Sequence, residues 1–366
     1  MVFWYRHAMC RELSVLFGAA LVATACSNSS PTSEAPSVDA ATPPPIMQKA
    51  FGPRLLVTNE ASGDLTVMDL ATRQVTATIP LGKRPRGIVV GPDRKMAYVA
   101  LSGSPPAGPG VDQSTLPPPD RSADGIGVVD LDTGTLLRVL PSGPDPERLA
   151  VSLDGRWILV TNEDAALTSI VDVGEGTVVA TVKVGGEPEG VDLRPDGKVV
   201  YVTSEEDGEV FVIDVATRAL VTKFAVGPRP RSTAFLPDSS KAYVTSENGG
   251  SVAVVDAQAH SVLATIQLPG ELVRPMGVVA SPDGTHVYVT TGRGKMLVAI
   301  DTKTQTPVWS VEVGTRPWGV AISPDGSTIY TANGPSNDIT VVDVATRTVV
   351  AKVKAGDKPW GAAVVP

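Results

Sequence analysis

The sequence predicts an all-β protein, a seven-bladed β-propeller made of four-stranded antiparallel blades. The main evidence is a repeat in which a short apolar run ends in Asp. The seven residues concerned are Asp69, Asp130, Asp172, Asp214, Asp256, Asp301 and Asp343. Four of the six intervals between them are 42 residues long, and the other two are 61 and 45 residues long. A fixed period in the low forties on β-rich sequence indicates a propeller or a solenoid.

A proline recurs with the same period at Pro85, Pro146, Pro188, Pro230, Pro275, Pro317 and Pro359. The last complete unit shows what lies between these markers. Residues 318–322, 328–332, 339–343 and 348–353 are β-branched or apolar, and Gly, Pro, Asp and Asn separate them. Each unit therefore predicts four short strands joined by tight turns.

The two ends of the repeat region complete one blade between them. The chain ends after a single strand, residues 361–365, and the repeats begin at residues 54–58 with the next kind of strand. Six whole blades and one shared blade make seven. Sharing a blade closes the ring and protects the edges of the sheets, whereas a linear solenoid would need a capping repeat at each end.

Residues 1–25 predict an export signal. Arg6 and Arg11 precede an apolar stretch at residues 13–25, which is too short to span a bilayer comfortably. The Ala-x-Ala at residues 23–25 is typical of ordinary signal cleavage.

Cys26 directly follows that signal and allows a second interpretation, lipid attachment. Residues 26–50 are rich in Ser, Pro and Thr and are expected to act as a tether. We favour lipid attachment because the tether begins at the Cys, while simple secretion stays open. The predicted location is periplasmic or at the cell surface. Contact with a membrane is then expected only through the anchor, and residues 51–366 form the propeller.

Composition excludes several kinds of function. The formal net charge of −8 disfavours nucleic acid and anionic membrane surfaces as partners. The other cysteine, Cys10, lies in the signal, so a mature chain has no internal disulfide and no cysteine metal site. His260 and His286 are expected far from the working face. No G-x-S-x-G, P-loop or H-E-x-x-H motif occurs. We therefore predict no metal and no cofactor, and the sequence favours a protein that is not an enzyme.

The residues flanking each repeated proline are expected to line a central funnel, because the innermost strands begin there. The predicted ligand- or partner-binding residues are Arg84, Arg86, Asp145, Glu147, Glu187, Glu189, Arg229, Arg231, Arg274, Arg316, Trp318, Lys358 and Trp360. Arg binds carboxylates and phosphates bidentately, and Trp offers a flat face to a ring. A second interpretation is that neighbouring Arg and Glu pair with each other and lock the blades. Both interpretations stay open.

Carboxylates on two neighbouring units are expected to cluster. They are Asp145, Glu147, Glu163, Asp164, Glu187 and Glu189. Such a cluster suits Ca²⁺, a hydrolase that uses only Asp and Glu, or pairing with Arg, and pairing is favoured. The small residue after each marker, at Gly87, Gly190, Gly277, Gly319 and Gly361, is expected to let backbones converge near the axis.

A Pro-rich insertion of 19 residues follows Leu101 and is expected to project from the funnel face. It predicts a lid or a partner contact, and a disordered insertion is the alternative. A second insertion, of three residues, lies near residues 270–272 beside the funnel.

The strands L-V-T-N at 56–59 and 159–162 and Y-V-T-S at 201–204 and 243–246 resemble the YVTN-type (YncE-like) propeller repeat. The loops match a subgroup, the exported propellers associated with PQQ-dependent alcohol catabolism. The segments concerned are residues 84–87, 142–147, 187–190, 228–231, 246–250 and 333–338. The resemblance covers nearly all of residues 54–365 and implies the propeller fold. This chain departs from it by the insertion after Leu101, a shorter loop before Pro275 and the tethered start.

These observations favour an exported, non-enzymatic binding or scaffold protein. Its charged funnel would be presented to an unidentified envelope protein or an anionic small ligand, in connection with a periplasmic PQQ-type redox system. One alternative is a carboxylate- or metal-dependent hydrolase or lyase, because exported seven-bladed lactonases and lyases resemble this architecture. The other is a purely structural surface propeller.

Overall fold

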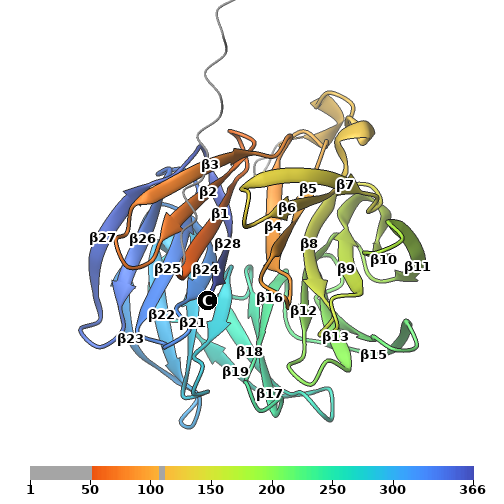
Figure 1. Ribbon diagram of the computed structural model, residues 1–366. Helices are drawn as coiled ribbons and strands as arrows, with labels where there is room; N and C mark the ends of the chain where they lie inside the picture. Colours follow the sequence, from red (N-terminus) through yellow and green to blue (C-terminus); the bar gives the residue numbers. More distant parts are fainter. Residues whose placement is uncertain (1–51, 107–111) are drawn as a thin grey trace, which may run out of the picture. The chain divides into compact units, whose positions relative to one another are not determined.

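The computed structural model describes residues 52–106 and 112–366, and these form the predicted seven-bladed propeller (Figure 1). The export signal, Cys26 and the tether lie outside the described residues, so the predictions made for them stay predictions. No helix within the described ranges has the length and apolar character needed to cross a membrane.

Each blade is a sheet of four antiparallel strands. Blade 1 contains β28 (Pro359–Val365), β1 (Arg54–Asn59), β2 (Asp64–Asp69) and β3 (Val75–Pro80). Blade 2 contains β4 (Pro85–Val90), β5 (Met96–Leu101), β6 (Gly125–Asp130) and β7 (Thr135–Leu140). Blade 3 contains β8 (Pro146–Val151), β9 (Trp157–Asn162), β10 (Leu167–Asp172) and β11 (Thr177–Lys183). Blade 4 contains β12 (Pro188–Leu193), β13 (Val199–Ser204), β14 (Glu209–Asp214) and β15 (Ala219–Ala225).

The remaining blades repeat the same order, innermost strand first. Blade 5 contains β16 (Pro230–Phe235), β17 (Lys241–Ser246), β18 (Ser251–Asp256) and β19 (Ser261–Gln267). Blade 6 contains β20 (Val278–Ala280), β21 (His286–Thr290), β22 (Met296–Asp301) and β23 (Thr306–Glu312). Blade 7 contains β24 (Pro317–Ile322), β25 (Thr328–Asn333), β26 (Asp338–Asp343) and β27 (Thr348–Lys354). The described residues also contain four short 3₁₀ turns, at η1 (Gln113–Thr115), η2 (Arg121–Ala123), η3 (Glu163–Ala165) and η4 (Gly292–Gly294).

The shared blade is confirmed. β28 at the C-terminus pairs antiparallel with β1, with Arg54 opposite Val365 and Leu56 opposite Ala363. This pairing completes the blade and places β1 inside the sheet, between β28 and β2, instead of at its edge.

Each third strand ends in Asp, and the Asp side chain caps the turn that follows. The Oδ1 atom of Asp69 accepts a hydrogen bond from the Thr72 amide at 2.7 Å, and Asp214 and Asp343 do the same for Thr217 and Thr346. These bonds to backbone amides hold the pKa of Asp69, Asp214 and Asp343 below the usual value. The repeat therefore marks a turn on the face opposite the funnel.

The core lies between neighbouring blades. The middle strands are buried almost throughout, as in β17 and β18, while the outermost β27 alternates exposed and half-buried residues. Leu56 and Leu65 of blade 1 pack with Val99 and Leu101 of blade 2 in one such layer. Blade-to-blade packing thus replaces a single central core, which is why a chain of this length forms one ring.

A threonine in the second strand ties the centre of the ring together in five blades. These residues are Thr58, Thr161, Thr203, Thr245 and Thr290. In blade 5, Thr245 Oγ1 donates to the carbonyl of Met276 in the next blade at 2.8 Å and accepts from the amide of Ser232 in its own blade at 3.0 Å. Ala100 and Ala332 occupy this position in blades 2 and 7. The threonine of the Y-V-T repeat is therefore an inter-blade latch.

The glycine after each marker is required by close approach, as predicted. A Cβ on Gly190 would lie 2.4 Å from the carbonyl oxygen of Arg231, and one on Gly87 would lie 2.7 Å from the Cα of Arg148. No real side chain tolerates such contacts. Blades 3 and 5 differ, since Arg148 and Ser232 occupy this position there.

One expectation about strand starts is corrected. Six innermost strands begin at the repeated proline, but β20 begins at Val278, three residues after Pro275. The three-residue insertion lies just upstream, and Leu272 within it has a φ of 54° and is 72% exposed. The longer connection enters the blade later, so only three residues of this strand pair.

Candidate functional site

The residue after each marker proline forms a ring around the axis. This axial ring consists of Arg86, Glu147, Glu189, Arg231, Met276, Trp318 and Trp360. All are buried except Trp318, which is half-buried. The residue before each proline forms a rim above this ring. The rim residues are Arg84, Asp145, Glu187, Arg229, Arg274, Arg316 and Lys358. Six of the seven rim residues, all but Arg274, have positive φ, which is uncommon for residues other than glycine. The fold therefore brings the predicted funnel residues together.

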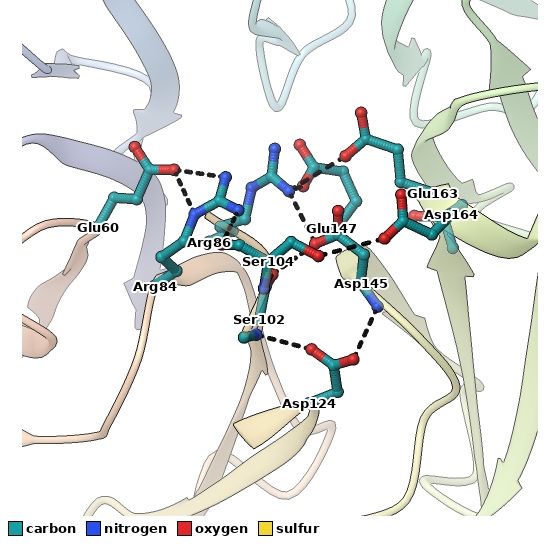
Figure 2. Close-up of polar contacts among 12 residues, drawn as sticks. Glu60, Arg84, Arg86, Ser102, Ser104, Asp124, Asp145, Glu147, Glu163 and Asp164 are labelled. Atoms are coloured by element: carbon teal, nitrogen blue, oxygen red, sulfur yellow. Dashed lines mark hydrogen bonds and ion pairs between the residues drawn. The ribbon is translucent and has the colours of Figure 1, made fainter. Parts of the chain in front are cut away.

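Arg86 organises one group of carboxylates (Figure 2). Its Nη1 atom pairs with Glu147 of the neighbouring blade and lies 3.5 Å from Asp145 and 3.3 Å from Glu163. Glu147 is fully buried. Burial disfavours the charged guanidinium, but attraction by Glu163 and Asp145 outweighs it and raises the pKa of Arg86. Burial raises the pKa of Glu163, although Arg86 opposes this.

The described part of the Pro-rich insertion is fixed to this side of the funnel. Arg121 pairs with Asp124 at 3.1 Å and with Asp164 from blade 3. Asp124 accepts hydrogen bonds from the amides of Gly103 at 2.7 Å and Asp145 at 3.1 Å (Figure 2). Residues 107–111 lie outside the described residues, so the choice between a lid and a partner contact stays open.

Arg231 organises a second carboxylate group in blades 4 and 5. It pairs with Glu189 and Glu205, and its Nε donates to Glu247 at 2.7 Å. Arg229 lies 2.5 Å from Glu205 and 3.2 Å from Glu247. Three glutamates thus share two arginines. Burial raises the pKa of Glu205 to about 9, because attraction by Arg229 is offset by Glu163, Glu187 and Glu247.

The opposite sector of the ring is aromatic and cationic. The rings of Trp318 and Trp360 have centroids 5.6 Å apart and are tilted by 50°. The guanidinium of Arg316 lies 5.1 Å from the Trp318 centroid, within cation–π range. Among the residues that the structure describes, Arg316 and Lys358 have no carboxylate at ion-pair distance. Burial lowers the pKa of Arg316, and Arg293 adds to this effect.

These aromatic and cationic residues border a cavity of about 210 Å³, which we call the tryptophan pocket. Its polar and aromatic lining is Glu60, Arg84, Arg86, Arg316, Trp318, Lys358 and Trp360. A cavity of about 490 Å³ lies beside it and is lined by Asp145, Glu163, Asp164 and Glu187, with Pro117 and Arg121 of the insertion. Arg84 and Arg86 line both cavities. One small molecule can therefore contact the cationic pocket and the carboxylates together.

The carboxylate cluster has the form of ion pairs with arginine. Over residues 52–106 and 112–366, no group of three His, Cys, Asp or Glu side chains has an arrangement that could hold a metal ion. Asp145, Glu147 and Glu163 instead converge on Arg86, and Glu189 converges on Arg231. The pairing that the second interpretation predicts is thus present for these residues.

His260 lies in the turn between β18 and β19, and its Nδ1 atom is 2.7 Å from the hydroxyl of Tyr201, with which it forms a hydrogen bond.

Two charged residues near the axis were missed from sequence. Arg148 lies directly after the ring residue Glu147, and its guanidinium lies 4.8 Å from the Trp360 centroid. Asp192 lies on β12, and burial raises its pKa to about 6 against the attraction of Arg148. Alignment of the repeats carries the signal for Arg148, because five other blades have glycine there. The same alignment carries a signal for Asp192, because the other six blades have Val or Ala at its position.

Comparison with known proteins supports the propeller fold. A family model described as a seven-bladed β-propeller lactonase matches residues 188–356, and a model of the cytochrome D1 heme domain matches residues 119–233. A search of curated proteins gave no match.

Solved structures match over most of the chain. A Bacteroides uniformis protein provisionally assigned as a 6-phosphogluconolactonase aligns with a TM-score of 0.70 and 18% identity, covering 85% of this chain and 99% of its own. A Bacteroides fragilis protein with the same provisional assignment has a TM-score of 0.68 and 19% identity, covering 87% and 99%. Hydrazine synthase of Kuenenia stuttgartiensis has a TM-score of 0.68 and 21% identity, covering 80% and 92%. At these identities the likeness concerns the fold.

Proposed function

We propose that this protein hydrolyses lactones of small anionic sugar acids in the funnel. The observation that carries the proposal is the junction of two cavities. The tryptophan pocket offers cations that lack a carboxylate partner among the described residues, and it shares Arg84 and Arg86 with the carboxylate-lined cavity. The match of residues 188–356 to the lactonase model and the structural likeness to the two Bacteroides proteins support the same activity.

Substrate binding follows from the chemistry of the tryptophan pocket. Arg316 and Lys358 would hold a phosphate or carboxylate of the substrate, because Arg binds such groups bidentately and Lys acts as a point charge. Trp318 would pack against the face of the sugar ring. The bound anion would direct the lactone carbonyl toward the second cavity.

Hydrolysis needs a base to activate water and an acid to protonate the leaving oxygen. Glu187 lines the carboxylate cavity and has no ion-pair partner among the described residues, which suits the base. Glu163 has a raised pKa and suits the acid. The water oxygen bonds to the carbonyl carbon as Glu187 takes its proton. The ring carbon–oxygen bond then breaks, and Glu163 protonates the alkoxide.

The test is proton release by the purified full chain, followed in a pH-stat with 6-phosphogluconolactone and with uncharged gluconolactone. We expect turnover above the spontaneous rate, with the charged lactone preferred by about tenfold or more. Glu187→Gln should abolish turnover, and Arg316→Ala should raise KM for the charged lactone only. Lys352→Ala changes an exposed lysine of outer strand β27 and is the matched control. Spontaneous rates with both lactones would overturn the proposal.

A second candidate is a non-enzymatic module that binds an envelope protein or an anionic small molecule, as part of a PQQ-type redox system. The observation in its favour is that Arg86 and Arg231 are already bound by carboxylates, which leaves the rim for outside contacts. Affinity capture from envelope extract would compare the wild type with an Arg316→Ala, Trp318→Ala double variant. A partner retained only by the wild type, without lactone turnover, would favour this candidate. Equal recovery would favour the third alternative, a purely structural propeller.

Export with a lipid on Cys26 is part of the proposal. Cys26→Ser should move the protein from the membrane fraction to the soluble envelope fraction, because the Cys26 thiol would be the acceptor for the lipid. Fractionation with immunoblotting measures this. Recovery of the wild type in the soluble envelope fraction, as for the variant, would support simple secretion instead.

A further inference from the structure

A third cavity lies on the axis of the propeller beside the ring. Its volume is about 300 Å³, and Trp360 borders both this axial cavity and the tryptophan pocket. The lining comes from the innermost strands and is mostly aliphatic, with Ile88, Leu149, Val191, Val278 and Val320 among its residues. The funnel chemistry described above uses none of these residues.

Two side chains of opposite charge belong to the same lining. Arg148 comes from β8 and Asp192 from β12, and both side chains are half-buried. The Arg148 Nε atom is buried without an acceptor, and one face of its guanidinium is covered by the Trp360 indole at 4.8 Å. Asp192 uses its Oδ2 atom to accept from the Thr233 amide at 3.0 Å. Within the described residues the two groups are not at ion-pair distance from each other.

This separation distinguishes the pair from the ring above it. Arg86 and Arg231 lock neighbouring blades by direct contact with Glu147 and Glu189. Arg148 and Asp192 also belong to neighbouring blades and line one cavity, yet no ion pair joins them in the described chain. Closure of the ring does not need the arginine either, since five other blades have glycine at the same position.

We propose that the axial cavity binds a small aliphatic zwitterion, an α-amino acid with a short side chain. The ligand carboxylate pairs with the Arg148 guanidinium, and the ligand ammonium pairs with the Asp192 carboxylate. The alkyl group packs against Val191 and the other aliphatic side chains. This inference does not depend on lactone hydrolysis in the funnel.

The arrangement of charge selects a zwitterion over simpler ions. A monocarboxylate would pair with Arg148 but would be repelled by Asp192, which has no cation at ion-pair distance in the described chain. A simple amine would pair with Asp192 but would be repelled by Arg148, which has no carboxylate at ion-pair distance in the described chain. A zwitterion satisfies both groups and brings no net charge into the cavity.

The test is isothermal titration calorimetry on the full chain with glycine, L-alanine and L-valine as probes. Isobutyrate and isobutylamine serve as controls that carry only one of the two charges. We expect the best amino acid to bind at least about tenfold more tightly than either control. No measurable binding of any of the three amino acids would overturn the proposal, and so would equal affinity for isobutyrate.

Variants then separate a binding role from a structural one. Arg148→Gly restores the residue of the other blades and should fold, while Asp192→Asn preserves the shape of the side chain. Each should weaken amino-acid binding by about tenfold or more, and Arg148→Lys should retain part of it. Thr181→Val, at an exposed site on outer strand β11, is the control that should leave binding unchanged. Unchanged affinity in both Arg148→Gly and Asp192→Asn, each shown to be folded by circular dichroism, would overturn the site.

The pH dependence provides an independent measure of the same contact. Burial raises the pKa of Asp192 to about 6, with Arg148 opposing and the Thr233 amide donating to it. Amino-acid affinity should therefore fall as the pH is lowered from 7 to 5, because the carboxylate that pairs with the ammonium is lost. Asp192→Asn should remove this dependence. A wild-type affinity that is flat over this range would contradict the role of Asp192.

Discussion

The cations in the two halves of the ring have different surroundings. In the paired half, blades 2 to 5, Arg86 and Arg231 are each surrounded by carboxylates, and almost no side-chain surface is left exposed. In the aromatic half, blades 6, 7 and 1, Arg316 and Lys358 border a pocket beside two tryptophans. No carboxylate of the described chain lies at ion-pair distance from them.

The difference separates cations that hold the ring from cations available to a ligand. A buried arginine with several carboxylates cannot be removed without leaving uncompensated charge, so it is expected to govern stability. A partly exposed arginine without such partners contributes little to stability and retains its donors for a ligand. Repeat-equivalent positions can therefore have opposite roles within one ring.

The largest effect is expected for Arg231→Met. It leaves the buried Glu189 without a cation, and Glu205 and Glu247 with Arg229 alone, so it should reduce the free energy of unfolding by about 3–5 kcal/mol. Urea denaturation followed by circular dichroism measures this. A loss below about 1 kcal/mol would mean that the paired half does not lock the blades.

Glu205 predicts a pH dependence of stability. Its folded-state pKa of about 9 lies above the ordinary value of 4.5, so the folded protein binds this proton more tightly than the unfolded chain does. The corresponding stability is fully present below about pH 4.5 and is lost as the pH rises through about 9. Glu205→Gln should flatten this decline in urea titrations between pH 6 and 9. A decline of the same slope in the variant would show that another group causes it.

A smaller loss of stability is expected when one inter-blade latch is removed. Thr245→Val removes the hydroxyl that joins Met276 and Ser232, and should cost about 1–3 kcal/mol because the buried carbonyl and amide lose their partner. Thr181→Val on outer strand β11 serves as the exposed control and should change stability little. Equal thermal midpoints for the two variants would contradict the latch.

The smallest effect on stability is expected for Arg316→Ala. Its loss should change the free energy of unfolding by no more than about 0.5 kcal/mol, since no carboxylate pair of the described residues is broken. The same variant should impair binding of the anionic substrate in the lactonase assay. Destabilisation as large as that of Arg231→Met would remove the distinction between the two halves.

Most of the fold could be predicted from the repeats. The turn-capping Asp, the marker proline and the glycines near the axis each correspond to a local physical requirement, and all recur with one period. Closure of the ring could also be predicted, because the first and last strands of the repeat region are different members of one blade. The late start of β20 could not be predicted, since strand pairing after Pro275 depends on how a longer connection approaches the blade.

The sequence by itself determined the propeller, the number of blades and the set of residues around the funnel, because local turn and strand preferences repeat seven times. The roles within that set were decided only by the tertiary structure. Whether an arginine is paired depends on distances between side chains from different blades, and local sequence does not encode these distances. The common cavity of Arg148 and Asp192 was decided by the tertiary structure for the same reason. These residues lie 44 positions apart in the chain and line one cavity only when blades 3 and 4 close around the axis.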